Sequence, residues 1–284
     1  MERVHLGFKA FDMHELLCHF VAREAGLYQR AGLEVRLLDT TFIPDERLPD
    51  RNFQVACGAA LMSWLQGTSY RVVMTAVDRP MFWLYARPGI AGLQALTGER
   101  IAGFPVMAPP AHFLSAILSQ QGLTENDLNV EAVRDDTARL GLLRSGEVAA
   151  AVISSAYIPG QVAAMGYQPL VFFGSCLRVP TTGLAVTERQ LEQETDLVEK
   201  MVHVFRRSLE LIHSDRDLLG RVLADYFQVP DPLVTAGCDL AQHCFSQTGR
   251  CENQVGRAAV AMMAEQLGRR ADSAYNLYDF RFLE

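Results

Sequence analysis

Hydrophobic and polar positions follow one another in short blocks that predict strands alternating with helices. Residues 3–8 (RVHLGF) and 33–38 (LEVRLL) are typical of strands, and 14–32 carries apolar residues at the three- and four-residue spacing of an amphipathic helix. Similar strand patterns are predicted at 53–58, 70–77, 81–87, 99–104, 128–133, 148–154 and 170–174, and helices at 60–67, 111–122 and 136–146. This alternation predicts an α/β fold with a mainly parallel sheet.

The last third of the chain changes character. From Thr187 onward the pattern is almost wholly helical, through 190–214, 217–227 and 256–268. The tail 274–284 is rich in aromatic residues, and we expect part of it to dock on the folded protein.

Four segments in a fixed order resemble a known family. They are 23–38 (REAGLYQRAGLEVRLL), 92–104 (GLQALTGERIAGF), 142–167 (LLRSGEVAAAVISSAYIPGQVAAMGY) and 180–191 (PTTGLAVTERQL). Together they resemble the sulfonate/nitrate/taurine-type substrate-binding proteins of ABC transporters and their NMT1/THI5-like relatives.

The resemblance implies a two-lobed periplasmic-binding-protein type II fold. Lobe one would comprise 1–85 and 183–284 and lobe two 86–182, with the two crossings acting as a hinge that closes a ligand cleft between the lobes. A small organic ligand and an ABC transporter permease would be the partners.

The chain departs from its relatives at several positions. Gln54 and Ala149 stand where the family often has aspartate. The cysteine-rich motif of the pyrimidine-synthesising relatives is absent, and Met13 stands where a related desulfinase has its cysteine. The sequence therefore does not carry over either of those enzymatic activities.

Composition narrows the partners and the compartment. With 26 Lys and Arg against 33 Asp and Glu, the net charge of -7 argues against nucleic acid, which requires a concentrated basic face. No apolar run reaches the length of about 20 residues that spans a bilayer. The first residues lack the features of a signal peptide, so we expect a cytoplasmic protein, or a periplasmic one if an export signal has been removed.

Neither a metal nor another cofactor is predicted. Cys238, His243, Cys244 and Cys251 lie close together in sequence, but their spacing matches no structural zinc module. A chain of 284 residues is large enough to need no disulfides for its stability.

Candidate ligand-binding residues follow from a general rule, because ligands of open α/β sheets bind outside the carboxyl ends of the strands. Candidates are the residues that follow these predicted strand ends, together with those at the second crossing. They are Lys9, Phe11, Asp12, His14, Phe42, Cys57, Gly58, Ala59, Arg79, Met107, Ala108, Ser154, Ser155, Tyr157, Thr181 and Thr182.

These residue types favour an organic ligand over a bare anion. Pro109 and Pro110 remove two backbone donors from a helix start, whereas the amides of Gly58 and Ala59 remain as an anion-binding alternative. Phe11, Phe42 and Tyr157 suit a flat or apolar body. Lys9 or Arg79 would then pair with a carboxylate or sulfonate on that body.

Two functions remain open from the sequence. The first is a non-catalytic solute-binding protein for an aromatic or heteroaromatic acid, a sulfonate or a pyrimidine-like compound. The second is a cytoplasmic enzyme on the same fold acting on a small aromatic or heteroaromatic acid. Its candidate nucleophile is Cys57, at a helix start where the dipole favours a thiolate, with His14 as base. The alternative for Cys57, which we favour because free cysteines are commonly buried, is a small residue packed between strand and helix.

Overall fold

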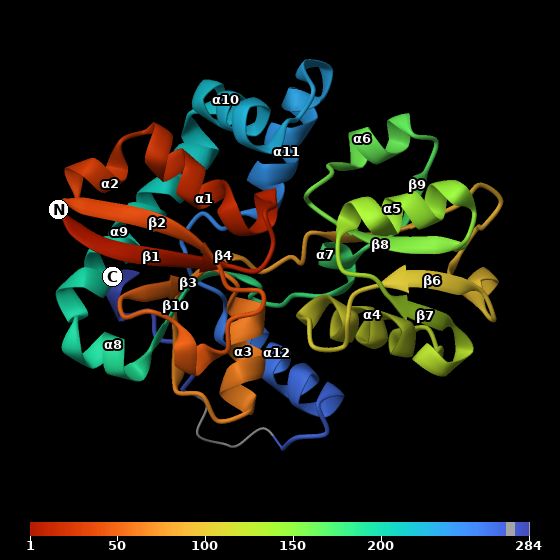
Figure 1. Cartoon of the computed structure of the whole chain (residues 1–284), viewed down its shortest axis with the longest axis horizontal. Helices are drawn as coiled ribbons and strands as arrows, with labels where there is room; N and C mark the ends of the chain where they lie inside the picture. The colour runs from red at the N-terminus through yellow and green to blue at the C-terminus, as the bar shows by residue number, and fades with distance from the viewer. Residues whose placement is uncertain (271–275, 284) are drawn as a thin grey trace. The chain divides into compact units, whose positions relative to one another are not determined.

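The computed structural model describes residues 1–270 and 276–283, and the chain forms two compact units (Figure 1). Unit 1 comprises Met1–Asp78 and the chain from Val179 onward, and unit 2 comprises Arg79–Arg178. These boundaries fall earlier in the chain than the sequence predicted, because the strand Phe82–Ala86 pairs only with strands of unit 2.

Unit 1 contains a five-stranded sheet in the order β2-β1-β3-β10-β4. Its strands are β1 (Glu2–Phe8), β2 (Leu33–Asp39), β3 (Asn52–Gln54), β4 (Tyr70–Val77) and β10 (Thr182–Thr187). β1 pairs in parallel with β2 and β3, whereas β10 runs antiparallel to β3 and β4. The carboxyl ends of β1, β2, β3 and β4 therefore share one edge of the sheet with the amino end of β10.

Helices cover both faces of this sheet, and Figure 1 shows α3 and α12 side by side. The helices of unit 1 are α1 (Met13–Glu24), α2 (Leu27–Arg30), α3 (Cys57–Leu65), α8 (Glu188–Gln193), α9 (Thr195–Ser214), α10 (Arg216–Phe227), α11 (Val234–Cys244) and α12 (Asn253–Gln266). The predicted helix 14–32 is divided into α1 and α2 by Gly26, whose φ of 66° lies in the left-handed region that favours glycine.

Unit 2 has its own five-stranded sheet in the order β7-β6-β8-β5-β9. Its strands are β5 (Phe82–Ala86), β6 (Arg100–Gly103), β7 (Asn129–Ala132), β8 (Ala150–Ser154) and β9 (Gln168–Phe172). Its helices are α4 (Pro109–Gln120), α5 (Asp136–Ser145), α6 (Pro159–Ala164) and α7 (Phe173–Cys176). Figure 1 shows α4 and α5 on either side of the strands, so the near-continuous apolar strand β8 is buried on both faces.

Both sheets are mainly parallel, as predicted, but each contains one antiparallel strand that makes it mixed. β5 runs antiparallel to β8 and β9, as β10 does to its neighbours in unit 1. Each of these strands follows directly on a point where the chain passes from one unit to the other. The strand at 182–187 was missed by the pattern analysis, which assigned this stretch no strand before the C-terminal helices.

The described part of the tail docks on unit 1. Leu277 is fully buried, its carbonyl accepts a hydrogen bond from the Val72 amide, and the Asp279 amide donates to Val72 O. This confirms the predicted docking for 276–283, whereas residues 274, 275 and 284 lie outside the described residues.

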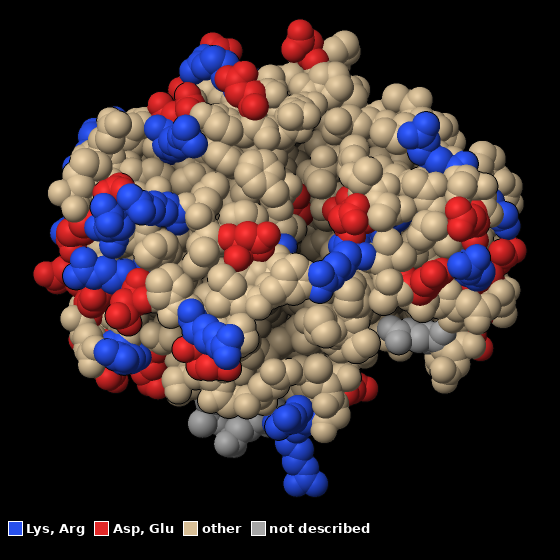
Figure 2. All heavy atoms as spheres, in the orientation of Figure 1, with Lys and Arg blue, Asp and Glu red and all other residues tan. Residues whose placement is uncertain are grey.

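Charged side chains are interspersed on the face shown in Figure 2, where acidic and basic groups alternate over unit 1. Ion pairs of Glu34 with Arg3 and Arg36 are examples from the β2 edge. In the described ranges, no helix combines the length and the apolar character needed to cross a membrane.

Candidate functional site

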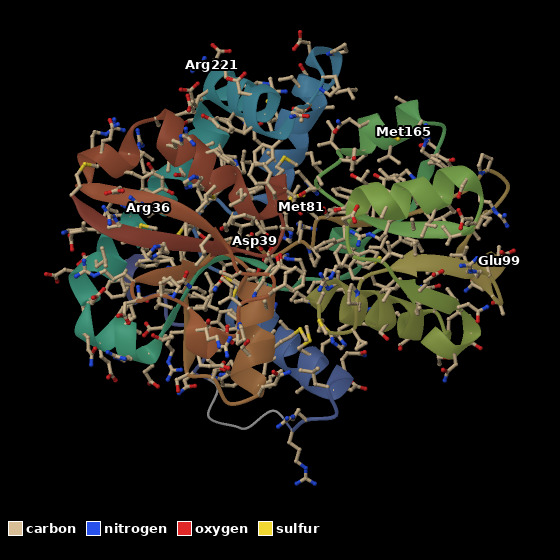
Figure 3. The ribbon with its side chains drawn as sticks, viewed as in Figure 1. Arg36, Asp39, Met81, Glu99, Met165 and Arg221 are labelled. Atoms are coloured by element: carbon tan, nitrogen blue, oxygen red, sulfur yellow. The ribbon has the colours of Figure 1, made fainter. Side chains whose placement is uncertain are left out.

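Most of the predicted site residues lie in the loops at the carboxyl ends of the strands, and these loops form a rim on each unit. We define the unit 1 rim as residues 9–15, 39–45, 55–59 and 181–182. The unit 2 rim is residues 79–82, 104–108, 136–139 and 154–158. Figure 3 labels Arg36, which lies within β2, and Asp39, which ends β2 and belongs to the unit 1 rim.

The β1–α1 loop of the unit 1 rim is organised by two carboxylates. Asp12 is the N-cap of α1, and its Oδ1 accepts the Glu15 amide at 2.9 Å. The Glu15 side chain turns back further, and its Oε2 accepts from the backbone amides of Lys9 at 2.7 Å and Ala10 at 3.2 Å. Burial, together with the nearby Asp12 charge, raises the pKa of Glu15 above its usual range.

The ammonium group of Lys9 is hydrogen-bonded within the protein. Its Nζ donates to the carbonyl oxygen of Thr40 at 2.6 Å, which ties the β1–α1 loop to the end of β2. Burial lowers the pKa of Lys9, although the carboxylates of Asp45, Glu15 and Asp39 act in the opposite direction. The bond to Thr40 uses one of the three N–H donors of Lys9 and fixes the position of its ammonium group at the rim.

Two backbone amides in the first turn of α3 already donate to carbonyl oxygens of the protein. The Cys57 amide donates to Val55 O at 2.9 Å and the Gly58 amide to Thr181 O at 3.0 Å. The proposed use of Gly58 to bind an anion is therefore wrong, because its donor already has an acceptor. Ala59, in the same turn, is half-buried.

Cys57 and His14 are both buried, at 1% and 3% exposure. Burial raises the pKa of the Cys57 thiol well above its usual range, and Cys57 Sγ faces Met74 O at 3.9 Å. Desolvation thus opposes the thiolate that a helix start would otherwise favour, in keeping with Cys57 as a small buried packing residue. His14 Nε2 lies 2.7 Å from Thr181 Oγ1, and burial lowers the pKa of His14 to about 3.

Thr181 and Thr182 begin β10 at the same edge and are both buried. The Thr181 hydroxyl also contacts Val77 O at 3.2 Å, so His14 and Thr181 join α1 to the end of β4. Thr182 Oγ1 has no hydrogen-bond partner among the described residues.

Two phenylalanines of the unit 1 rim are exposed. Phe11, which follows β1, is 53% exposed, and Phe42, which follows β2, is 63% exposed. Phe11 packs its ring against Phe20 at a centroid distance of 5.7 Å and against Phe227 at 6.4 Å. It therefore presents one face to solvent from an ordered aromatic base.

The unit 2 rim is organised by a buried ion pair. Asp136 accepts at Oδ1 from the Ser154 amide at 2.7 Å and at Oδ2 from the Ser154 hydroxyl at 2.8 Å. Arg139, which is fully buried, donates to Asp136 Oδ1 at 2.7 Å and to Val133 O at 2.6 Å. Its guanidinium also lies 3.7 Å from the centroid of the Phe104 ring, a cation–π contact.

The other predicted residues of the unit 2 rim divide into exposed and engaged side chains. Val106 and Met107 are 71% and 79% exposed, and Ala108 is the N-cap of α4. Arg79 donates from Nη1 to Gly174 O at 3.2 Å, and Tyr157 Oη lies 3.1 Å from Thr137 Oγ1. Ser154 and Ser155 are buried.

Sequence reasoning missed three residues that shape the rims: Glu15, Asp136 and Arg139. The spacing Asp12-Met13-His14-Glu15 matches a capping box, in which the residue three after the cap reaches back toward the preceding backbone. That signal was available for Glu15. The link between Asp136 and Ser154 joins positions 18 residues apart, and local pattern gave no sign of it.

Within the described ranges, no group of three or more His, Cys, Asp or Glu side chains is arranged to hold a metal ion. The cysteines at 238, 244 and 251 are buried thiols.

Two α/β units with mixed five-stranded sheets, joined by two chain crossings, are the architecture of the periplasmic-binding-protein fold. The periplasmic aliphatic sulphonate binding protein SsuA from Escherichia coli is similar, with a TM-score of 0.80 and 13% identity over 98% of this chain and 92% of that one. The desulfurization enzyme DSZB is similar, with a TM-score of 0.72 and 15% identity over 99% and 98% of the two chains. A Candida albicans gene product, CA3427, described as having the generic periplasmic binding protein fold, gives a TM-score of 0.71 and 10% identity over 98% and 96%.

The family NMT1/THI5 like matches residues 15–217, well over half of the chain. The chain therefore belongs to the NMT1/THI5-like family. A comparison with curated protein sequences gave no match.

Proposed function

We propose that this protein is a solute-binding protein that takes up a small organic molecule with a flat or apolar body. One observation carries the proposal. Among the described residues, the exposed large hydrophobic side chains are those of Met1, Phe11, Phe42, Val106, Met107 and Met165. Four of these six follow strand ends in the rims, where ligands of α/β sheets bind.

Exposed apolar side chains gathered in this way have a physical cost, because each leaves surface in water that folding could have buried. In each unit, their position after strand ends (β1 and β2 in unit 1, β6 in unit 2) is explained if that rim contacts an apolar ligand in the working protein.

The family supports the same proposal. One neighbour of the same fold is described as a periplasmic aliphatic sulphonate binding protein, and another, from Staphylococcus aureus, as the ligand binding component of an ABC-type import system. We therefore include an ABC transporter permease as the proposed partner. Fractionation of the native cells, with detection by antibody, tests the location this implies; recovery of the protein solely with cytoplasmic markers would argue against transport.

The ligand is tested by native mass spectrometry of the purified protein, followed by calorimetry with the molecule identified. Phe11→Ala and Phe42→Ala are expected to weaken binding by about 2- to 10-fold each, the usual range for one aromatic contact. Met165→Ala is the matched control, because this exposed methionine lies at the end of α6 (Figure 3) and should leave affinity unchanged. Equal effects at all three positions would contradict the assignment of the rim.

The alternative function, an enzyme with Cys57 as nucleophile, finds no support in the geometry. The thiol is buried with a raised pKa, and burial lowers the pKa of His14 to about 3, which makes it a weak base for that thiol. Alkylation by iodoacetamide at neutral pH, mapped by peptide mass spectrometry, is expected to modify the exposed Cys176 first and Cys57 much later. Faster reaction at Cys57 would restore the enzyme hypothesis.

A further inference from the structure

Two backbone amides of the β1–α1 loop already donate to a side chain of the protein, that of Glu15. Lys9 and Ala10 lie at the carboxyl end of β1, and both of their amides donate to a single oxygen of Glu15. Two amides converging on one oxygen is an arrangement that suits an anion. Here the side chain of Glu15 fills that position.

The other helix starts of the rims are occupied in similar ways. At α3, the amides of Cys57 and Gly58 donate to backbone carbonyls. At α4, two of the first positions are prolines without an N–H, and the Ala108 amide donates to Pro105 O at 2.8 Å. After β8, the Ser154 amide donates to Asp136 and the Ala156 amide to Ser154 Oγ.

The cationic side chains of the rims are also engaged. Lys9 Nζ donates to Thr40 O, and Arg79 Nη1 donates to Gly174 O. Arg139 is fully buried against Asp136 and Phe104. At Lys9 and Arg79 these bonds fix one donor of each cationic group within the protein, which restricts how the group can turn toward an incoming anion.

The unit 1 rim also carries an excess of acidic groups. Its loops 9–15 and 39–45 contain four acidic residues, Asp12, Glu15, Asp39 and Asp45. Lys9 is the single Lys or Arg in these two loops. The raised pKa of Glu15, caused by burial and by Asp12, reflects how poorly this surrounding accommodates added negative charge.

We propose that Glu15 makes this protein selective against anions, so that its ligand is an uncharged or basic aromatic molecule rather than a sulfonate or carboxylate. The inference rests on the proposed solute-binding function and names the ligand class of the same rim. It reverses the organic acid expected from the sequence, because Glu15 occupies the two amides at the end of β1 and the Gly58 amide is bonded to Thr181. The exposed rings of Phe11 and Phe42 suit such a ligand, since aromatic faces attract both apolar surfaces and cations.

The test requires no knowledge of the natural ligand. Methanesulfonate, a sulfonate head group with almost no body, is titrated into the full ¹⁵N-labelled chain while the amide signals of Lys9 and Ala10 are followed by NMR. In the wild type, no saturable shift is expected. In Glu15→Ala, whose two amides lose their acceptor, a saturable shift confined to this loop is expected.

Two further variants control for charge and for folding. Glu15→Gln keeps an oxygen that can accept both amides, and we expect it to behave as the wild type does. Glu46→Gln removes the same charge from an exposed residue nearby and should also leave methanesulfonate unbound. A well-dispersed amide spectrum for each variant shows that it is folded.

Saturable binding of methanesulfonate at Lys9 and Ala10 in the wild type would overturn the inference. Failure of Glu15→Ala to bind it, or equal binding by Glu15→Gln, would overturn the role given to the occupied amides. These outcomes differ from failure of the proposed function, which would show as the absence of any organic ligand in the mass-spectrometric search. A co-purified sulfonate would support solute binding and overturn the inference about its class.

Discussion

Each rim holds a carboxylate against the backbone of a neighbouring loop, but the charge around that carboxylate differs. In unit 2, Asp136 binds the amide and hydroxyl of Ser154 and is matched by the guanidinium of Arg139. In unit 1, Glu15 binds two loop amides and has a second acid, Asp12, as its neighbour. The same kind of hydrogen bonding thus gives a turn with balanced charges in unit 2. In unit 1 it gives an acidic loop whose carboxyl group has a raised pKa.

The comparison can be tested one unit at a time, because each unit contains one of the two tryptophans. Trp64 lies in α3 of unit 1 and Trp83 in β5 of unit 2. In a Trp64→Phe background fluorescence reports on unit 2, and in a Trp83→Phe background it reports on unit 1. The predictions below use urea unfolding followed in the relevant background.

The largest effect is expected from breaking the buried pair of unit 2. Arg139→Met should lower the free energy of unfolding of unit 2 by about 3–5 kcal/mol, because it removes the partner of a carboxylate in a buried pair. Arg100→Met breaks the exposed pair of Arg100 with Glu131 in the same unit and should cost less than about 1 kcal/mol. Equal losses from the two changes would mean that the buried pair does not stabilise the turn.

The second-largest effect is expected from acidification, which should lower the stability of unit 1 through two buried histidines. Burial lowers the pKa of His14 to about 3 and, aided by Arg23, that of His19 to about 4. Below about pH 6.5 the unfolded chain takes up protons that these folded histidines refuse, so unit 1 should lose roughly 2 kcal/mol per histidine by pH 5. The raised pKa of Glu15 acts in the opposite sense, since its contribution is lost as the pH rises through the folded value.

The double variant His14→Gln/His19→Gln is the control for this pH effect. It should flatten the decline of unit 1 stability between pH 7 and pH 5, while the pH dependence of unit 2, measured through Trp83, stays as it was. An unchanged decline in the double variant would assign acid sensitivity to other groups.

The smallest effect, and the one that sharpens the comparison most, concerns the two helix caps. Asp12 and Asp135 cap α1 and α5 in the same way, accepting from the amide three residues on at 2.9 and 2.7 Å. Asparagine caps as well as aspartate, so Asp135→Asn should change the stability of unit 2 by less than about 0.5 kcal/mol. Asp12→Asn also removes the charge beside Glu15 and should stabilise unit 1 by roughly 1 kcal/mol at pH 8.5.

A loss of stability in Asp12→Asn would show that the Asp12 charge is satisfied elsewhere and that the unit 1 rim is less acidic than we infer. The pKa of Glu15 itself, read from the ¹³C shift of its carboxyl group, should move downward in this variant.

Sequence pattern was enough to locate the strands other than β10, and the first helices, because burial on one or both faces of an element leaves a regular spacing of apolar residues. β4, predicted at 70–77, has these bounds in the structure, and Gly146 ends α5 in the left-handed conformation expected of a helix stop. The rule that ligands bind at strand ends likewise led to Phe11, Phe42 and Met107 from local order alone.

What the side chains at those ends do was decided by tertiary contacts. Cys57 was placed correctly at a helix start, but whether its thiol ionises depends on the strands and helices around it, which bury it. The amide of Gly58 and the side chain of Lys9 looked available in sequence, and in the fold they are bonded to the carbonyl oxygens of Thr181 and Thr40. The sequence by itself determined which residues stand at the rims; the three-dimensional packing decided which of their donors and charges remain for a ligand, because hydrogen bonding and desolvation depend on neighbours that are remote in the chain.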